Sequence, residues 1–197
     1  MDKRLGWLIL MAVLPLALAL GCGEMGKVDQ GRVVAYDKDK QTVTLIKDKK
    51  AEPGSPDYNT LPPHTYALPK DPHEMGPEPK AGLRMKLDAK AKEITIFDPA
   101  AQNFKKIAYT LIDQKEGVDK SNPLVAGKQF PMVDKSKKAI TIYSGRQKIL
   151  TTFTVPEEFF AMPDDTWDAG DEVRIYFKEP GKALRLMNIS KTDIFKK

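Results

Sequence analysis

Short runs in which apolar and polar residues alternate recur along most of the chain. They are rich in Val, Ile and Thr, as in "TVTLI" (42–46), "EITIF" (93–97) and "AITIY" (139–143). Alternation with a period of two, carried by β-branched residues, is typical of half-buried strands. No long stretch shows the helical period; a single helical turn is expected at 155–162, where Pro156 suits a first helical position. The pattern predicts an all-β protein with one short helix.

One of these patterns occurs three times, as "GRVVAYDKDKQTVTLI", "GLRMKLDAKAKEITIF" and "GKQFPMVDKSKKAITIY". In each copy an aspartate (Asp37, Asp88 or Asp134) lies six residues before a β-branched residue. Two strands around a polar centre predict a β-hairpin with an exposed turn, and a looser fourth copy begins at Gly170. Lysines stand where a calcium loop needs oxygen ligands, so we interpret the aspartates as turn residues. Duplication of one hairpin and convergence of several explain the repeat equally well.

The second half of the chain resembles an OB-fold barrel in the order of its elements. It contains strand patterns at 128–133, 138–143 and 147–155, a helical turn at 156–161, and strand patterns at 172–178 and 183–189. The resemblance implies an OB-like β region at 117–197. It would follow a first β region at 31–116 that lacks the helix. The two regions are expected to form either two small barrels or one larger folded sheet.

Residues 51–80 interrupt the strand pattern. Eight of the 15 prolines lie here, which argues against a regular element. We interpret 48–80 as a long Pro-rich insertion that covers a barrel or serves as a contact arm. A contact arm would present Leu61, Tyr66 and Leu68 along a surface.

Both histidines of the chain, His64 and His73, lie in this insertion, with Met75 close by. Imidazole and thioether groups suit copper, so a copper-handling site at these three residues is the alternative to a contact arm. A copper site predicts that the three side chains converge, whereas a contact arm predicts that they diverge.

Large aromatic residues flank the predicted helical turn: Phe159, Phe160 and Trp167. Such side chains usually close a hydrophobic core, which is the role expected for them. The alternative is an exposed aromatic platform on which Trp167 contacts a partner.

The first residues of the chain have the features of an export signal. A basic start precedes an apolar run that is shorter than most membrane-spanning helices and ends in small residues. The residues from Ala19 to Cys22 resemble the lipobox of bacterial lipoproteins. The resemblance implies that residues 1–21 are cleaved off as a signal peptide. It also implies that the thiol of Cys22 is lipidated and that 22–30 form a tether.

Lipidation would attach the protein to a membrane without a spanning segment, because two or more acyl chains give stable attachment. The expected location is the bacterial cell envelope, facing the periplasm. Gly23 follows the cysteine in place of the aspartate that retains some lipoproteins at the inner membrane, which favours the outer membrane.

Composition and missing motifs narrow the expected function further. The net charge of +5 is spread over scattered lysines, which does not indicate nucleic-acid binding. A single cysteine excludes disulfides within the chain and Cys-based metal or redox sites. Catalytic motifs are missing, and the acidic residues Asp164, Asp165 and Asp168 fit a turn better than a glycan-cleaving pair.

We therefore expect a non-catalytic protein without a cofactor. It would act as a binding or assembly accessory of another envelope component, either a protein or a polymer. Periplasmic copper handling through the loop at 64–75 is the alternative function.

Overall fold

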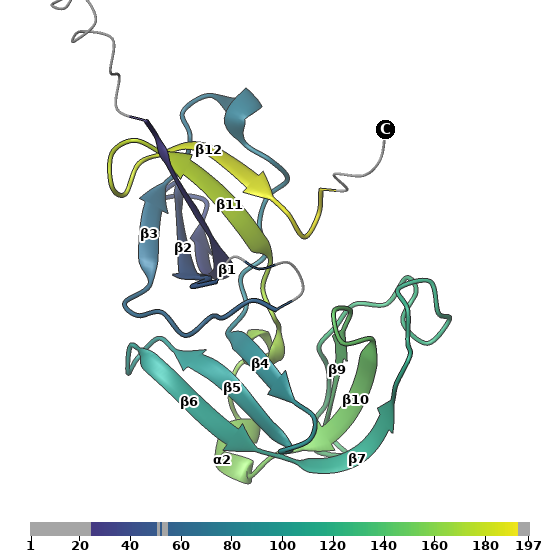
Figure 1. Ribbon diagram of the computed structural model, residues 1–197. Coiled ribbons are helices and arrows are strands. Elements are labelled where there is room, and N and C mark those ends of the chain that lie inside the picture. The colour runs from purple at the N-terminus through teal and green to yellow at the C-terminus, as the bar shows by residue number, and fades with distance from the viewer. Residues whose placement is uncertain (1–24, 51, 53–54, 193–197) are drawn as a thin grey trace, which may run out of the picture.

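The protein is described by a computed structural model, which covers residues 25–50, 52 and 55–192. The strands form two lobes, one above the other in Figure 1. The upper, or terminal, lobe combines strands from both ends of the described chain. The lower, or central, lobe contains the strands in between. The predicted signal peptide and lipidation site, 1–21 and Cys22, lie outside the described residues and stay predictions.

The terminal lobe is one antiparallel sheet in the order β12-β11-β1-β2-β3. Its strands are β1 (Lys27–Asp37), β2 (Thr42–Lys47), β3 (His64–Ala67), β11 (Glu172–Phe177) and β12 (Ala183–Asn188). The two outer strands approach each other, because an isolated parallel bridge joins Ala67 to Lys182 and the backbone N–H of Ala67 donates to Gly181 O at 2.8 Å. The result has the strand order of a partly open OB-like barrel.

The central lobe contains two sheets that share one apolar core. One sheet has the order β4-β5-β6 and the other β7-β10-β9-β8. The strands are β4 (Arg84–Asp88), β5 (Glu93–Asp98), β6 (Asn103–Ala108), β7 (Thr110–Lys115), β8 (Met132–Asp134), β9 (Ala139–Ser144) and β10 (Ile149–Thr154). The helix α2 (Glu157–Phe160) and the 3₁₀ helix η2 (Asp164–Trp167) follow. Inward-facing residues of both sheets, such as Ile96 and Ile142, bury their side chains in this core.

The predicted hairpins are confirmed, and their turns share one geometry. Asp37, Asp88 and Asp134 each end a strand and accept hydrogen bonds from backbone N–H groups two or three residues later. The fourth residue after each aspartate, for example Lys92, has a positive φ near 50°. A positive φ also occurs four residues after the end of β5 and of β9, at Gln102 and Lys148. Turn chemistry therefore accounts for the aspartate spacing.

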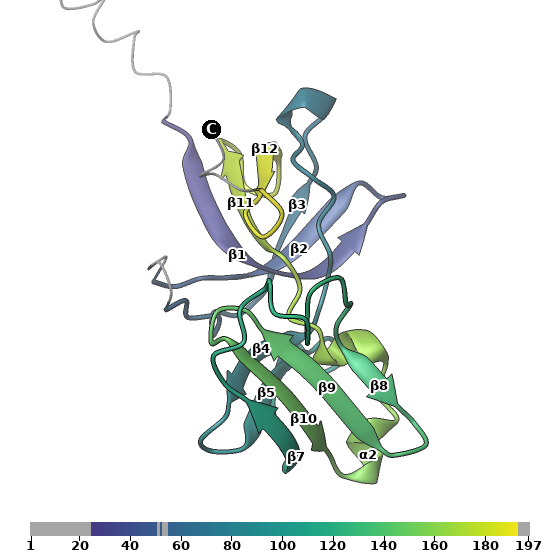
Figure 2. The ribbon, with the colours of Figure 1, turned by 90° about the vertical axis from the view of Figure 1, so that its right-hand side faces the viewer.

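A third apolar cluster joins the two lobes. Val34 and Ile46 of the terminal lobe pack with Met85 and Phe97 of the central lobe and with Tyr58. Figure 2 shows that β1 and β2 cross just above the central lobe. Burial of this cluster supports a fixed arrangement of the lobes.

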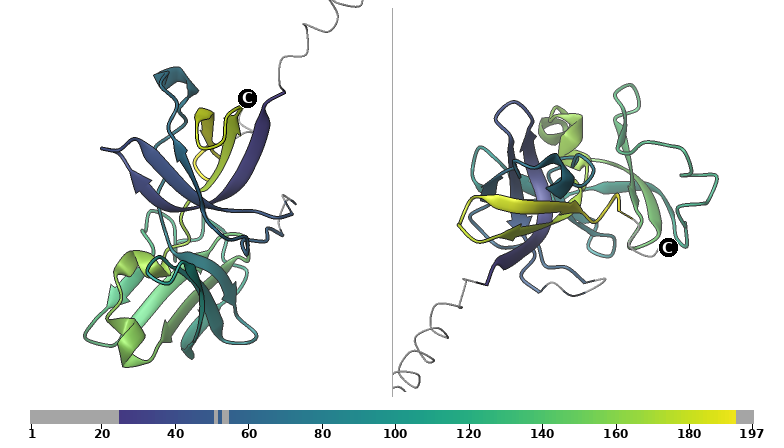
Figure 3. Two further views of the ribbon diagram at one scale, coloured as in Figure 1. Left: turned by 90° about the vertical axis from the view of Figure 1, so that its left-hand side faces the viewer. Right: turned by 90° about the horizontal axis from the view of Figure 1, so that it is seen from above.

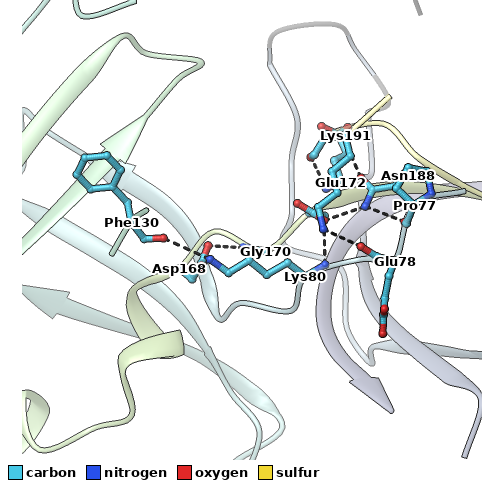
Figure 4. A network of polar contacts seen from close by, with 11 residues as sticks. Pro77, Glu78, Lys80, Phe130, Asp168, Gly170, Glu172, Asn188 and Lys191 are labelled. Atoms are coloured by element: carbon cyan, nitrogen blue, oxygen red, sulfur yellow. Dashed lines mark hydrogen bonds and ion pairs between the residues drawn. The ribbon is translucent and has the colours of Figure 1, made fainter. Parts of the chain in front are cut away.

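Polar contacts of Lys80 reinforce the junction, as Figure 4 shows. The Nζ of Lys80 pairs with Asp168 and donates to the carbonyl O of Phe130 at 3.3 Å, while its backbone N–H donates to Asp171 Oδ2 at 2.8 Å. Asn188, at the end of β12, donates to the same Asp171 oxygen at 2.8 Å and to Pro77 O at 3.2 Å. The C-terminal end of the Pro-rich segment is therefore tied to both lobes.

The all-β class is confirmed, but the predicted division of the chain needs correction. β7 pairs with β10, so a boundary at 116/117 would split a sheet. β11 pairs with β1 rather than with β8–β10, so 117–197 do not form an OB-like unit. The OB-like order belongs to the terminal lobe, and the central lobe is inserted between β3 and β11. Pairing between strands far apart in sequence produced this difference.

The Pro-rich insertion also differs from its prediction, because it contains regular elements. β3 lies between Pro63 and Pro69, and the 3₁₀ helix η1 (Pro72–Glu74) follows. The "HTYA" stretch of β3 alternates and contains no proline, which lets it pair with β2. Within the ranges that the structure describes, no helix has the length and hydropathy to cross a membrane.

Candidate functional site: two exposed faces and a charged groove

The outer face of the terminal lobe is formed by β1, β11 and β12. Asp29, Ile175 and Leu186 point into the lobe and are buried. The residues between them point outward. Val28 lies opposite Tyr176, and Tyr176 lies opposite Arg185. Strand alternation therefore places Val28, Tyr176 and Arg185 in one row across the face.

This outer face is unusually apolar for the solvent side of a sheet. Val28 is 54% exposed, Tyr176 36% and Leu184 45%. They border a groove of about 440 Å³ whose other lining residues are Glu74, Arg174, Arg185 and Met187. Antiparallel sheets commonly carry polar residues on the solvated face. A cluster of exposed apolar side chains with a polar rim indicates a contact surface.

Two arginines supply the polar rim. Arg185 forms a two-pronged ion pair with Glu74 of η1, with 3.0 Å between Nη2 and Oε1. The hydrogen bond and charge of Arg185 lower the pKa of Glu74, and those of Glu74 raise the pKa of Arg185. Arg174 donates to Gln30 Oε1 at 2.8 Å and 3.2 Å. The guanidinium groups are thereby held beside the apolar row.

The chain reaches this face directly from its N-terminal side. A Cβ built on Gly26 would lie 2.2 Å from the ring of Tyr176, so the backbone of Gly26 passes against that ring. A larger residue there would push the exposed end of the Tyr176 ring aside. Figure 3 shows β1 beginning at the end of the terminal lobe that is remote from the central lobe.

A second groove, of about 650 Å³, adjoins the first at Val28. Its lining includes Lys27, Lys47, His64, Phe177 and Pro180. The buried carboxylate of Asp29 lies at this groove. The groove therefore combines exposed cationic groups with an acid held beneath them.

Three side chains surround the Asp29 carboxylate. Lys47 Nζ lies 2.6 Å from Oδ1, and the hydroxyl of Tyr66 donates to Oδ2 at 2.5 Å. His64 Nδ1 lies 3.3 Å from Oδ2. Burial raises the pKa of Asp29, but the hydrogen bonds from Lys47 and Tyr66 outweigh it, so the net pKa is lowered. Burial, and then the bond to Asp29, raise the pKa of Tyr66, which keeps it a donor.

The outer face of the sheet β7-β10-β9-β8 is a second exposed surface. Thr152 lies opposite Thr141, their hydroxyl oxygens are 2.9 Å apart, and Met132 lies opposite Thr141. Met132 is 50% exposed, and Ile112 on β7 is 55% exposed. The row from Met132 through Thr141 and Thr152 continues to Asp113 on β7, and Ile112 lies next to Asp113 at the β-bulge of that strand.

The residues predicted for partner contact do not form a surface. Tyr66, Leu68 and Trp167 are buried, and Leu61 is half-buried against the junction cluster. Tyr66 points inward because strand alternation on β3 directs it toward Asp29. Trp167 closes the central core, where its ring meets Phe153 edge-on with 6.1 Å between centroids. The core interpretation of Trp167 is confirmed and the platform interpretation is wrong.

The copper alternative receives no support from the placement of its residues. His64 faces Asp29, Met75 packs against the terminal-lobe core beside Leu186, and His73 lies exposed on η1. Among the residues that the structure describes, no group of three or more His, Cys, Asp or Glu is arranged to hold a metal ion. The three predicted ligands thus lie in separate environments.

The acidic residues near η2 have structural roles. Asp164 and Asp165 are in the first turn of η2, and the N–H of Asp168 donates to Asp165 O at 3.1 Å. Asp168 also pairs with Lys80 and accepts from the N–H of Gly170 at 3.2 Å. They end the central lobe and join it to β11.

Comparison with known proteins gives one match, to the family described as a domain of unknown function, DUF4881. Its model matches residues 24–197, which include both lobes. The chain belongs to this family. No curated protein matches the chain, and no solved structure does. The DUF4881 match runs through the lobe junction, so the terminal and central lobes are parts of one family domain.

Sequence reasoning missed the exposed residues of both faces. Val28 lay in the segment assigned to the tether, and Tyr176 and Leu184 lay in the least regular hairpin copy. A signal was available, because "EVRIYF" alternates and Tyr176 is out of phase with Val173, Ile175 and Phe177. An apolar residue at an outward position of a strand indicates a surface contact.

Proposed function

We propose that this DUF4881 protein is a lipid-anchored, non-catalytic accessory of the bacterial cell envelope, facing the periplasm. Its role would be to hold the central lobe at a fixed distance from the membrane for binding to another envelope protein. The lipobox resemblance at Cys22 supports the anchor. The two-lobed arrangement supports separate roles, with the terminal lobe next to the membrane and the central lobe available for a partner protein.

The observation that carries this proposal is that the start of β1 and the central lobe lie at opposite ends of the molecule. β1 begins at the far end of the terminal lobe, and the central lobe lies at the opposite end (Figures 1 and 2). The junction core and the Lys80 contacts fix the two lobes together. A protein anchored through Cys22 would therefore extend its central lobe away from the lipid.

The outer face of the sheet β7-β10-β9-β8 is the surface we assign to the protein partner. Ile112 and Met132 supply exposed apolar groups at its two edges, and Thr141 and Thr152 supply hydroxyl groups between them. Such a mixture of apolar and hydrogen-bonding groups is usual in non-obligate interfaces. The expected partner is an envelope protein with an exposed apolar patch of its own.

Two experiments test the proposal. In cells, radiolabelled fatty acid should be incorporated into the wild type and not into Cys22→Ala, which should leave the membrane fraction. A photo-crosslinking residue at Ile112 or Met132 should then capture the same discrete protein. Gln102, exposed in the β5–β6 turn away from β7, is the matched control position. Unlabelled wild-type protein, or equal crosslinking from all three positions, would contradict the proposal.

A further inference from the structure

We propose that the outer face of the terminal lobe, formed around Val28, Tyr176 and Leu184, lies against the anionic lipid headgroups of the membrane that holds the anchor. This inference rests on the proposed lipidation of Cys22 and specifies how the anchored protein is oriented. It assigns one occupant, a phospholipid surface, to the apolar groove of about 440 Å³.

The length of the tether carries the first step. The backbone of Gly26 lies against the ring of Tyr176, and only four residue steps separate it from Cys22. A chain extends by at most about 3.3–3.6 Å per residue, so four steps span roughly 14 Å. A lipidated Cys22 would therefore keep Tyr176 within roughly 14 Å of the lipid surface. This is about half the thickness of a bilayer's hydrocarbon core, which is ~30 Å.

The chemistry of the face carries the second step. An exposed tyrosine with aliphatic neighbours suits the interface between headgroups and acyl chains, where amphipathic aromatic side chains are enriched. Val28 and Tyr176 are directly opposite each other on β1 and β11, and Leu184 borders the same groove. Their outward orientation is explained if they meet lipid rather than water.

Charge carries the third step. Five basic residues surround this end of the lobe: Lys27, Arg174, Lys178, Lys182 and Arg185. Two acids lie near them: the half-buried Glu74 pairs with Arg185, and the exposed Glu179 pairs with Lys182. The balance is cationic, and basic groups around an apolar centre are the usual design of surfaces that bind anionic lipid.

Vesicles to which the protein is attached through Cys22 provide the test. Cys22 is the only cysteine of the chain, so residues 22–197 can be coupled to a maleimide-headgroup lipid without further engineering. The vesicles contain phosphatidylethanolamine and phosphatidylglycerol with brominated acyl chains. The probe is Tyr176→Trp, and the matched control is Ile112→Trp on the central lobe. Trp167, 1% exposed, gives both variants the same background.

The expected result is a blue shift and loss of emission from the tryptophan at 176, with unchanged emission from the one at 112. Adding Val28→Glu and Leu184→Glu to Tyr176→Trp should abolish the quenching while circular dichroism remains unchanged. Replacing phosphatidylglycerol by phosphatidylcholine should weaken it. Quenching at neither position, equal quenching at both, or quenching that survives the two glutamates would overturn the inference. Because coupling is chemical, this result is independent of lipidation in cells, and failure of the fatty-acid labelling would be recognised separately.

Discussion

The hydroxyl of Tyr66 on β3 donates a 2.5 Å hydrogen bond to the carboxylate of Asp29 on β1, across the buried interior of the terminal lobe. The two strands are not neighbours in the sheet, because β2 lies between them. The bond therefore links the sheet across its curvature. It also fixes the acid beneath Lys47 and His64.

Replacing Tyr66 by Phe removes this bond and should lower the free energy of unfolding by about 1.5–3 kcal/mol at pH 7, the range for hydrogen bonds to charged groups. The pKa of Asp29 is lowered in the folded protein, so its stabilising contribution is present above the ordinary carboxyl pKa and is lost as pH falls through the lowered value. The difference between wild type and variant should therefore shrink in acid.

Urea unfolding at neutral and acidic pH measures this effect. Tyr143→Phe is the matched control, because Tyr143 donates to the neutral carbonyl of Val118 at 2.8 Å. It should cost about 0.5–1.5 kcal/mol, with no comparable pH dependence. A pH-independent difference for Tyr66→Phe would contradict a charge-assisted bond.

Lys92→Gly should stabilise the protein. Lys92 has φ of 53°, a left-handed conformation that costs an L-residue about 1–2 kcal/mol, against about 0.5–1 kcal/mol for the greater chain entropy of glycine. The net gain should be about 0.5–1 kcal/mol by chemical denaturation. Lys90→Gly, in the same turn but without a positive φ, should give no gain. Equal effects at both positions would refute the turn geometry.

Gly170→Ala should be far more damaging than Gly117→Ala, although both glycines have positive φ, +64° and +68°. A Cβ at Gly170 would lie 2.3 Å from the backbone O of Val33, whereas a Cβ at Gly117 meets nothing within 4 Å. Gly117→Ala should cost only the left-handed penalty of about 1–2 kcal/mol. Thermal unfolding of both variants isolates the clash, and similar losses would show that the lobe junction tolerates it.

Trp167→Ala should lower the free energy of unfolding by about 3–5 kcal/mol, because it empties a buried site in the central core. Trp167→Phe should cost less, since the ring contact with Phe153 is partly retained. Denaturation followed by circular dichroism measures both. A small loss for Trp167→Ala, comparable to an exposed substitution, would restore the platform interpretation.

Local patterns predicted the hairpins because their information lies within about a dozen residues. The aspartate, the left-handed residue four positions later and the alternating strands are all near neighbours in sequence. β3 was missed because prolines on both sides outweighed four alternating residues. Its place in the sheet depends on β2 and on the bond from Tyr66 to Asp29, which local propensity does not contain.

The division into lobes could not be predicted from the sequence for a related reason. β1 pairs with β11, and Gln30 donates to Glu172 over 142 positions of chain. Patterns of alternation show that a strand has a buried face, but not which strand lies beside it. For the same reason the sequence does not show that Val28 belongs to an apolar surface, because that depends on its pairing with Tyr176 on a distant strand.

The insertion of the central lobe between β3 and β11 determines the order in which the protein is able to fold. The hairpins of the central lobe consist of neighbouring residues and form through local contacts, which are fast. The first three strands of the terminal lobe cannot complete their sheet until β11 and β12, the last strands in the sequence, are available. Until Ile175 of β11 and Leu186 of β12 pack into the core of the terminal lobe, the inner face of β1 remains exposed. Loss of the final strands would therefore expose the start of the molecule, and a protein shortened at its C-terminus would be an early target for proteolysis.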